Sequence, residues 1–204
     1  FAQNGDKMII AAVDCTGHGV PGALMSMLGN SLLNRLVNDL NITQPAQILD
    51  ELREGVINSL KKNGTDPAHG GMDMALCTID LNKKQLQFAG AFNPLYFFRN
   101  GEFQQIKANR MPIGRYMHKS TDPFDNHVID LKEGDFFYIF SDGFQDQFGG
   151  PKDRKFSRKR FKNLLEGIHR LPVLEQKQAL EDTLAEWQGE GDQIDDVVVV
   201  GFGI

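Results

Sequence analysis

The stretch that decides the fold of this chain is Ala11-Ala12-Val13-Asp14-Cys15-Thr16-Gly17-His18-Gly19-Val20-Pro21-Gly22. The apolar residues before Asp14 extend back to Met8 and predict a buried strand. A glycine-rich turn follows the acid, and a long amphipathic helix follows the turn. This order predicts a carboxylate at the end of a sheet, where other chain segments can meet it.

Two further acidic sites stand at the ends of apolar strands. Asp142 follows the run 136–141, and the pair Asp195-Asp196 precedes the run 197–200. A carboxylate beside a buried strand costs several kcal/mol unless it is hydrogen-bonded or paired with a cation. Three such sites favour a shared cation, and ligation by oxygen atoms suits Mg²⁺ or Mn²⁺. The alternative is that each aspartate only caps a turn or a helix.

Composition limits the possible partners. The 204 residues are enough for one large domain, and the net charge of −5 leaves no broad basic field for nucleic acid or a membrane surface. No run of about 18 apolar residues occurs, and the first six residues do not resemble a signal peptide, so we expect no membrane contact by this domain. Cys15 and Cys77 lack a disulfide spacing, which favours a reducing, cytoplasmic compartment.

A local basic cluster, 152–162, is either the solvated start of a helix or a docking surface for an acidic or phosphorylated partner.

The remaining chain alternates between strand and helix patterns. Residues 1–3 are predicted to be the tail of a strand that enters a tight hairpin turn at Asn4-Gly5-Asp6. A helix from Val20 is expected to bury the stripe Leu24, Leu28, Leu32, Leu36 and Leu40. The other expected elements are a helix from Pro45; strands over 71–80, 86–91, 95–99, 102–106, 127–131 and 135–141; a surface loop over 109–126; helices after Ser157 and Pro172; and a strand over 197–204 buried on both faces. Two sheets between helical layers fit this order best.

Five ordered motifs resemble the SpoIIE-like bacterial branch of the metal-dependent PPM (type 2C) serine/threonine phosphatases. They are Val13–Gly19, Gly90-Ala91-Phe92-Asn93-Pro94, Pro112-Ile113-Gly114, Phe140–Gln147 and Gln193–Val197, and together they span nearly the whole chain. The resemblance implies an α+β fold, a four-layer αββα sandwich of two mainly antiparallel sheets flanked by helices. It also implies a site for two Mn²⁺ or Mg²⁺ ions at one end of the sheets.

The resemblance assigns metal ligands by position. Asp14 corresponds to the acid that bridges the two metals, and the backbone carbonyl of Cys15 to its neighbouring ligand. Asp142 and Asp195 correspond to further ligands, with Asp195 preferred over Asp196. The family carries another aspartate on a strand before the first hairpin. We therefore expect residues 1–204 to form a single domain that lacks this N-terminal strand.

Other residues of the motifs are candidates for catalysis or substrate binding. His18 is a candidate general acid for the leaving oxygen, with a hydrogen-bonded helix start as the alternative. Arg115 is a candidate phosphate contact, with a surface salt bridge as the alternative. Asp73 either lies near the metal ligands without binding the metal itself or has only a structural role at a turn or the end of a strand. The Cys15 thiol lacks an arginine-rich phosphate cradle, so we interpret it as structural.

The resemblance implies a protein phosphatase that hydrolyses phosphoserine or phosphothreonine with a metal-activated water. Its substrate would be a small signalling protein of the anti-sigma-factor antagonist type, and an upstream sensor or receiver domain would regulate it. The alternative is a catalytically inactive module that binds a phosphoprotein. A metal-dependent phosphodiesterase is a third possibility, but the histidine-rich ligand set usual for such sites is missing.

Overall fold

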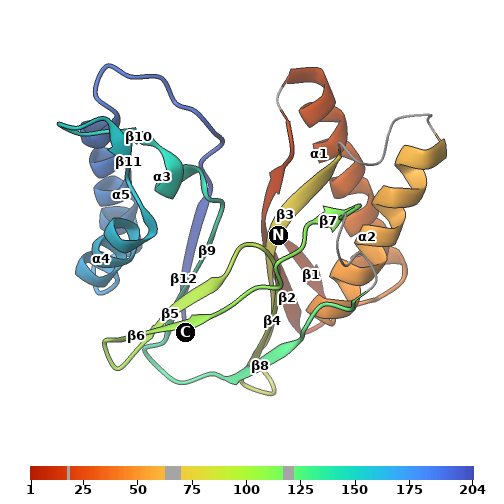
Figure 1. Ribbon diagram of the computed structural model, residues 1–204. Helices are drawn as coiled ribbons and strands as arrows, with labels where there is room; N and C mark the ends of the chain where they lie inside the picture. Colours follow the sequence, from red (N-terminus) through yellow and green to blue (C-terminus); the bar gives the residue numbers. More distant parts are fainter. Residues whose placement is uncertain (18, 63–69, 117–121) are drawn as a thin grey trace.

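The computed structural model describes residues 1–17, 19–62, 70–116 and 122–204. It has the predicted α+β architecture, in which two antiparallel sheets lie face to face between two pairs of helices (Figure 1). Among the described residues, no helix combines the length and the apolar character needed to cross a membrane.

Both sheets are antiparallel throughout. The larger sheet has the order β1-β2-β3-β4-β8, with β7 also paired to β3; its strands are β1 (Ala2–Asn4), β2 (Lys7–Cys15), β3 (Gly71–Asp80), β4 (Gln85–Ala91), β7 (Ile113–Gly114) and β8 (His127–Asp130). The smaller sheet has the order β12-β9-β5-β6, with β5 (Leu95–Arg99), β6 (Glu102–Ile106), β9 (Phe136–Phe140) and β12 (Val199–Gly203). The predicted hairpin at the start of the chain is confirmed, with Gly5 at a φ of 57° in its turn.

Helices cover the outer face of each sheet. The larger sheet carries α1 (Gly19–Asn34), the π-helical turn η1 (Arg35–Asp39) and α2 (Pro45–Lys62), while the smaller sheet carries α4 (Arg158–Ile168) and α5 (Val173–Gln188). Between β9 and α4 lie the short helix α3 (Gly143–Asp146) and a hairpin of β10 (Phe148–Gly149) and β11 (Arg154–Lys155).

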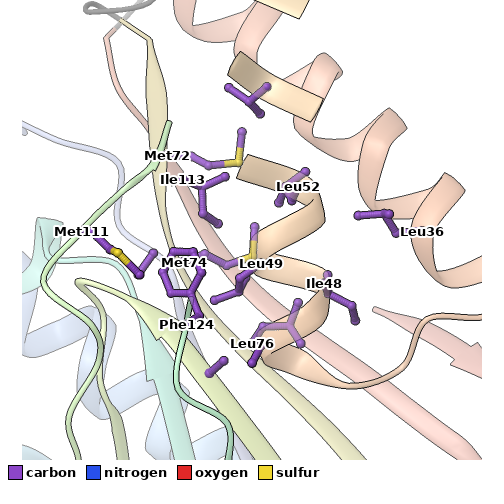
Figure 2. Close-up of a cluster of buried hydrophobic side chains, with 14 of the residues drawn as sticks. Leu36, Ile48, Leu49, Leu52, Met72, Met74, Leu76, Met111, Ile113 and Phe124 are labelled. Atoms are coloured by element: carbon purple, nitrogen blue, oxygen red, sulfur yellow. The ribbon is translucent and has the colours of Figure 1, made fainter. Parts of the chain in front are cut away.

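The alternation of side chains along the strands produces three apolar layers. In β3, Met74 faces α2 (Figure 2), whereas Ala75 faces the smaller sheet. In β9, Phe137 faces the larger sheet, whereas Tyr138 faces α4 and α5. The middle layer joins the two sheets, so their ends are held in fixed relative positions.

The predicted buried stripe of α1 is partly wrong. Leu36 is 6% exposed and Leu28 and Leu32 pack against the core, as predicted, but Leu24 and Leu40 are 60% and 52% exposed. Within α1 the fully buried residues are Gly22, Met25 and Gly29. A Cβ on Gly29 would lie 2.8 Å from the terminal methyl of Met72 in β3, so the helix backbone approaches the sheet closely at the glycines.

The predicted burial of the last strand on both faces is confirmed only in part, because Val200 and Val199 contact the apolar layers on opposite faces but neither is fully buried. Strand β12 lies at the edge of the smaller sheet, and its residues are mostly half-buried. A continuous apolar run is compatible with either position, because the sequence does not say whether a strand pairs on both sides.

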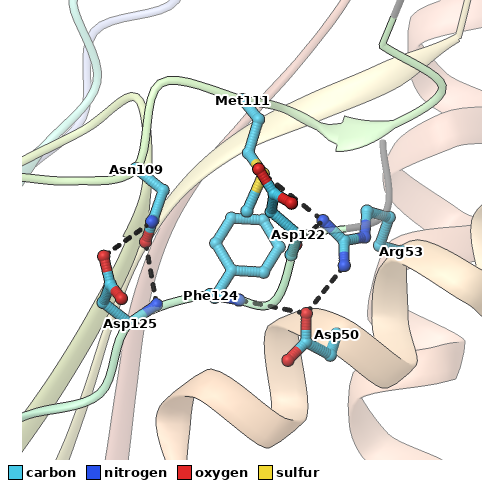
Figure 3. A network of polar contacts seen from close by, with 7 residues as sticks. All are labelled: Asp50, Arg53, Asn109, Met111, Asp122, Phe124 and Asp125. Carbon is cyan, nitrogen blue, oxygen red and sulfur yellow. Dashed lines mark hydrogen bonds and ion pairs between the residues drawn. The ribbon is translucent and has the colours of Figure 1, made fainter. Parts of the chain in front are cut away.

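The connection from β6 to β8 is tied to α2 by Arg53, which is 6% exposed. The guanidinium donates to the backbone oxygen of Asp122 at 2.9 Å and to the carboxylate of Asp50 at 2.8 Å (Figure 3). It also lies 4.9 Å from the ring centre of Phe124. This network anchors the connection that carries β7, and β7 in turn pairs with the first residues of β3.

Candidate metal centre

The turn after β2 brings Asp14 to the end of the larger sheet. Gly17 and Gly19 have φ values of 94° and 64°, which favour glycine. A Cβ on Gly22 would lie 2.6 Å from the carbonyl oxygen of Gly17, so the first turn of α1 packs directly on this loop. The backbone N–H of Thr16 donates to the carbonyl oxygen of Gly71 at 3.0 Å and fixes the loop to β3.

Two acids from the other half of the chain meet Asp14. Asp142 is the residue before α3 and follows β9, whereas Asp195 lies in the connection from α5 to β12. One carboxylate oxygen from each of Asp14, Asp142 and Asp195 lies within 4.8 Å of the other two. Segments far apart in the sequence thus place three carboxylates at the spacing of a shared ion.

A fourth carboxylate, Asp73, faces the same cavity. It lies on β3 directly opposite Asp14 in the antiparallel register. The cavity has a volume of about 470 Å³ and is lined by Asp14, Cys15, Thr16, Gly17, Asp73, Asp142, Gln193, Ile194, Asp195 and Asp196. From the sequence, Asp73 is equally compatible with a strand-end role; the strand register decides its place beside Asp14.

Burial and mutual repulsion change the acidity of these groups. Burial, followed by the charges of Asp195 and Asp142, raises the pKa of Asp14 from 3.8 to about 6. Burial, with the charges of Asp142 and Asp14, raises the pKa of Asp73 from 3.8 to about 7. The pKa of Asp142 is also raised, mainly by burial and then by Asp146 and Asp195.

These raised pKa values fit a cation site. Clustered carboxylates repel one another, and a divalent cation would offset that repulsion. The grouped donors are carboxylate oxygens, which suit Mg²⁺ or Mn²⁺ better than a softer metal. Asp14, Asp142 and Asp195 could hold such an ion.

The remaining predicted site residues occupy different settings. Cys15 lines the cavity, and burial raises the pKa of its thiol, which accords with a structural role for that side chain. Arg115 is exposed and does not line the cavity, although it directly follows β7. His18 lies outside the described residues.

The predicted basic cluster is partly engaged within the protein. Lys155 donates to the Asp146 carboxylate at 2.7 Å, Arg160 lies 4.5 Å from the ring centre of Trp187, and Lys162 lies 4.1 Å from that of Phe103. Lys155 also opposes the rise in the pKa of Asp142, so this cation lies near enough to influence the acidic cavity.

Comparisons with known proteins bear on the family and the fold. The profile of the family Stage II sporulation protein E (SpoIIE) matches residues 4–203. The SiaA-PP2C domain of Pseudomonas aeruginosa has 36% sequence identity and a TM-score of 0.89, over 100% of this chain and 78% of that one. The PP2C phosphatase domain of SpoIIE from Bacillus subtilis, solved with a fragment of its regulatory domain, has 20% identity and a TM-score of 0.75, over 97% of this chain and 55% of that one.

A further structural match has a composite domain organisation. The RsbU and RsbW domains of a Mycobacterium tuberculosis protein give 18% identity and a TM-score of 0.71, over 97% of this chain and 53% of that one. A search of curated proteins found no significant match.

Proposed function

This chain belongs to the SpoIIE family of PP2C-type (PPM) phosphatase domains, and from that premise we propose that it is a metal-dependent protein serine/threonine phosphatase. The observation that carries the proposal is the convergence of Asp14, Asp142 and Asp195 in one cavity. PP2C-type domains depend on metal ions in general, and we propose two Mn²⁺ or Mg²⁺ ions here.

The residues of this chain would act mainly by holding divalent ions at the site. Bound divalent ions supply a water of lowered pKa and neutralise charge on the phosphoryl oxygens. Asp14, Asp142 and Asp195 would be the carboxylate ligands, and the carbonyl oxygen of Cys15 a backbone ligand. Asp73 would add negative charge beside Asp14 from β3. His18 as the general acid and Arg115 as a phosphate contact remain parts of the proposal.

The proposed substrate is a phosphoserine or phosphothreonine on a bacterial signalling protein of the anti-sigma-factor antagonist type. Structural similarity to proteins with RsbU and RsbW domains supports this class. The cavity accords with a charged substrate bound through cations, because five aspartates line it. Two free cysteines support a cytoplasmic setting.

We also propose that the domain is completed by the expected upstream strand. Strand β1 already pairs with β2, with Ala2 opposite Ile9, so the expected residues before Ala2 would continue β1 along β2 toward Asp14. A sensor or receiver domain further upstream would supply regulation.

Metal-dependent hydrolysis tests the proposed function. Aryl phosphate and a phosphoserine protein are supplied with Mn²⁺ or Mg²⁺, and the variants Asp14→Asn, Asp142→Asn and Asp195→Asn are compared with the wild type. Loss of a ligand should remove several kcal/mol of transition-state stabilisation and lower kcat/KM about 100-fold or more. Asp39→Asn, an exposed acid on η1, is the control and should retain full activity. Unchanged activity in all three ligand variants would refute the assignment, and phosphoprotein binding without hydrolysis would indicate the inactive module.

A further inference from the structure

The connection that carries Asp195 has no regular secondary structure. It spans residues 189–198, and its first eight residues are exposed (Figure 1, arching from α5 to β12). Ordering such a segment costs conformational entropy, about 1–2 kcal/mol per residue for the backbone. A carboxylate that must lie within 4.8 Å of two others therefore needs anchors on its own segment.

Ser141 anchors the segment on the C-terminal side of Asp195. Its hydroxyl donates to the carbonyl oxygen of Asp196 at 2.8 Å and accepts from the N–H of Val198 at 3.0 Å. Ser141 is 1% exposed and directly precedes Asp142. This hydroxyl thus links the two acidic segments where they meet.

Gln147 anchors the segment on the N-terminal side. Its carboxamide nitrogen donates to the carbonyl oxygens of Asp192 at 2.9 Å and Phe148 at 3.0 Å. Its carboxamide oxygen accepts from the N–H of Ile194 at 3.4 Å, a longer and weaker contact. The side chain is 1% exposed, so water cannot replace these bonds.

Gln147 is itself held firmly. Its backbone oxygen accepts from the indole N–H of Trp187 at 3.1 Å and from the N–H of Phe156 at 2.9 Å. Its N–H donates to the carbonyl oxygen of Gly143 at 3.0 Å, which closes the single turn of α3. Asp142 and Gln147 therefore stand at the two ends of one short rigid unit.

We infer that Gln147 is a positioning residue that holds Asp195 at metal-binding distance from Asp142. The inference rests on the proposed function, because it assigns both carboxylates to one ion. The carboxamide nitrogen of Gln147 donates two hydrogen bonds, one of them to Asp192 in the Asp195 segment, and the carboxamide oxygen accepts one from Ile194 in the same segment. A glutamine that only filled the core would not need to contact that segment from both atoms.

A matched pair of substitutions tests the inference. Gln147→Met keeps the side-chain volume but removes the three hydrogen bonds. Gln176→Met does the same to another buried glutamine, which accepts from the Tyr138 hydroxyl at 2.6 Å and donates to the Leu171 carbonyl oxygen at 2.8 Å. Trp187, which donates to the backbone oxygen of Gln147, lies about 16 Å further along α5 than Gln176, at about 1.5 Å per residue. Gln176→Met should therefore lower stability without moving Asp142 or Asp195.

The readouts are calorimetric titration with Mn²⁺ and amide hydrogen exchange of the metal-free protein. Gln147→Met should weaken Mn²⁺ binding by about tenfold or more, as loss of a residue supporting a metal ligand does. It should also speed exchange at Ile194. Gln176→Met should leave Mn²⁺ affinity within about twofold of the wild type. If Gln147→Met fails to fold, Gln147→Ala, which removes the same bonds with less bulk, is measured instead.

Two results would overturn the inference: wild-type Mn²⁺ affinity in the Gln147 variant, or equal weakening in the Gln176 variant, which would mean a global effect. Wild-type protein that binds Mn²⁺ but hydrolyses no phosphoester would refute the proposed function and leave this inference standing. Wild-type protein that binds no Mn²⁺ would overturn both.

Discussion

Replacing Asp73 by asparagine should stabilise the metal-free protein at alkaline pH. The carboxyl of Asp73 has its pKa raised from 3.8 to about 7 by burial and by Asp142 and Asp14. A group whose pKa is higher in the folded state contributes its stability below the unfolded pKa and loses it as the pH rises through the folded value. Wild-type protein should therefore lose stability between about pH 4 and pH 8, whereas Asp73→Asn should lose less.

The magnitude follows from the shift and the exposure. The rise of the Asp73 pKa from 3.8 to about 7 corresponds to about 4 kcal/mol without screening. Asp73 is only half-buried, so solvent screening reduces the expected gain to about 1–2 kcal/mol. At about 2–4 °C per kcal/mol for a chain of this size, Asp73→Asn should raise the Tm by about 2–8 °C at pH 8.

Thermal unfolding in the presence of a chelator measures this difference directly. The comparison between variant and wild type at each pH cancels the contributions of titrating groups that do not interact with Asp73; Asp142 and Asp14 do interact with it. The advantage of Asp73→Asn should be small near pH 4, grow to pH 8, and shrink when saturating Mn²⁺ offsets the repulsion. A variant less stable than the wild type at pH 8 without metal would refute the argument that repulsion among these acids destabilises the cavity.

Two further substitutions test the packing around the site. Gly143→Ala should weaken Mn²⁺ binding and lower the free energy of unfolding by about 1–3 kcal/mol, because its Cβ would collide with the carbonyl oxygen of Asp196. The control Gly167→Ala on α4, with no neighbouring atom within 4 Å, should be neutral or stabilising. Equal Mn²⁺ affinity of the two variants by calorimetry would contradict this. Arg53→Met should lower the free energy of unfolding, measured by chemical denaturation, by about 2–3 kcal/mol, because Asp50 and the Asp122 carbonyl lose their buried partner. The control Lys177→Met, which breaks the exposed pair with Glu181, should lower it by under about 0.5 kcal/mol. Similar losses in the two variants would show that the Arg53 network is not a structural anchor.

Much of the architecture was predictable because it depends on local periodicity. Short apolar runs separated by turn residues, the Asn-Gly hairpin and the order of helices and strands were enough to predict two sheets between helical layers. The acids Asp14, Asp142 and Asp195 could be singled out because a charged group at the end of an apolar strand is costly without a partner. Their convergence in one cavity agrees with that reasoning.

Other features depended on contacts that no local pattern encodes. The face that α1 buries follows from the close approach of Gly29 to Met72, and the half-burial of β12 follows from its place at a sheet edge. Asp73 joins the acids because the register of β2 and β3 sets it opposite Asp14.

The sequence by itself determined which segments form helices or strands and where acidic residues stand at the ends of apolar strands, since both are properties of neighbouring residues. Only the tertiary structure decided which of those segments meet, because strand register, helix approach and anchors such as Gln147 are set by contacts between residues far apart in the chain.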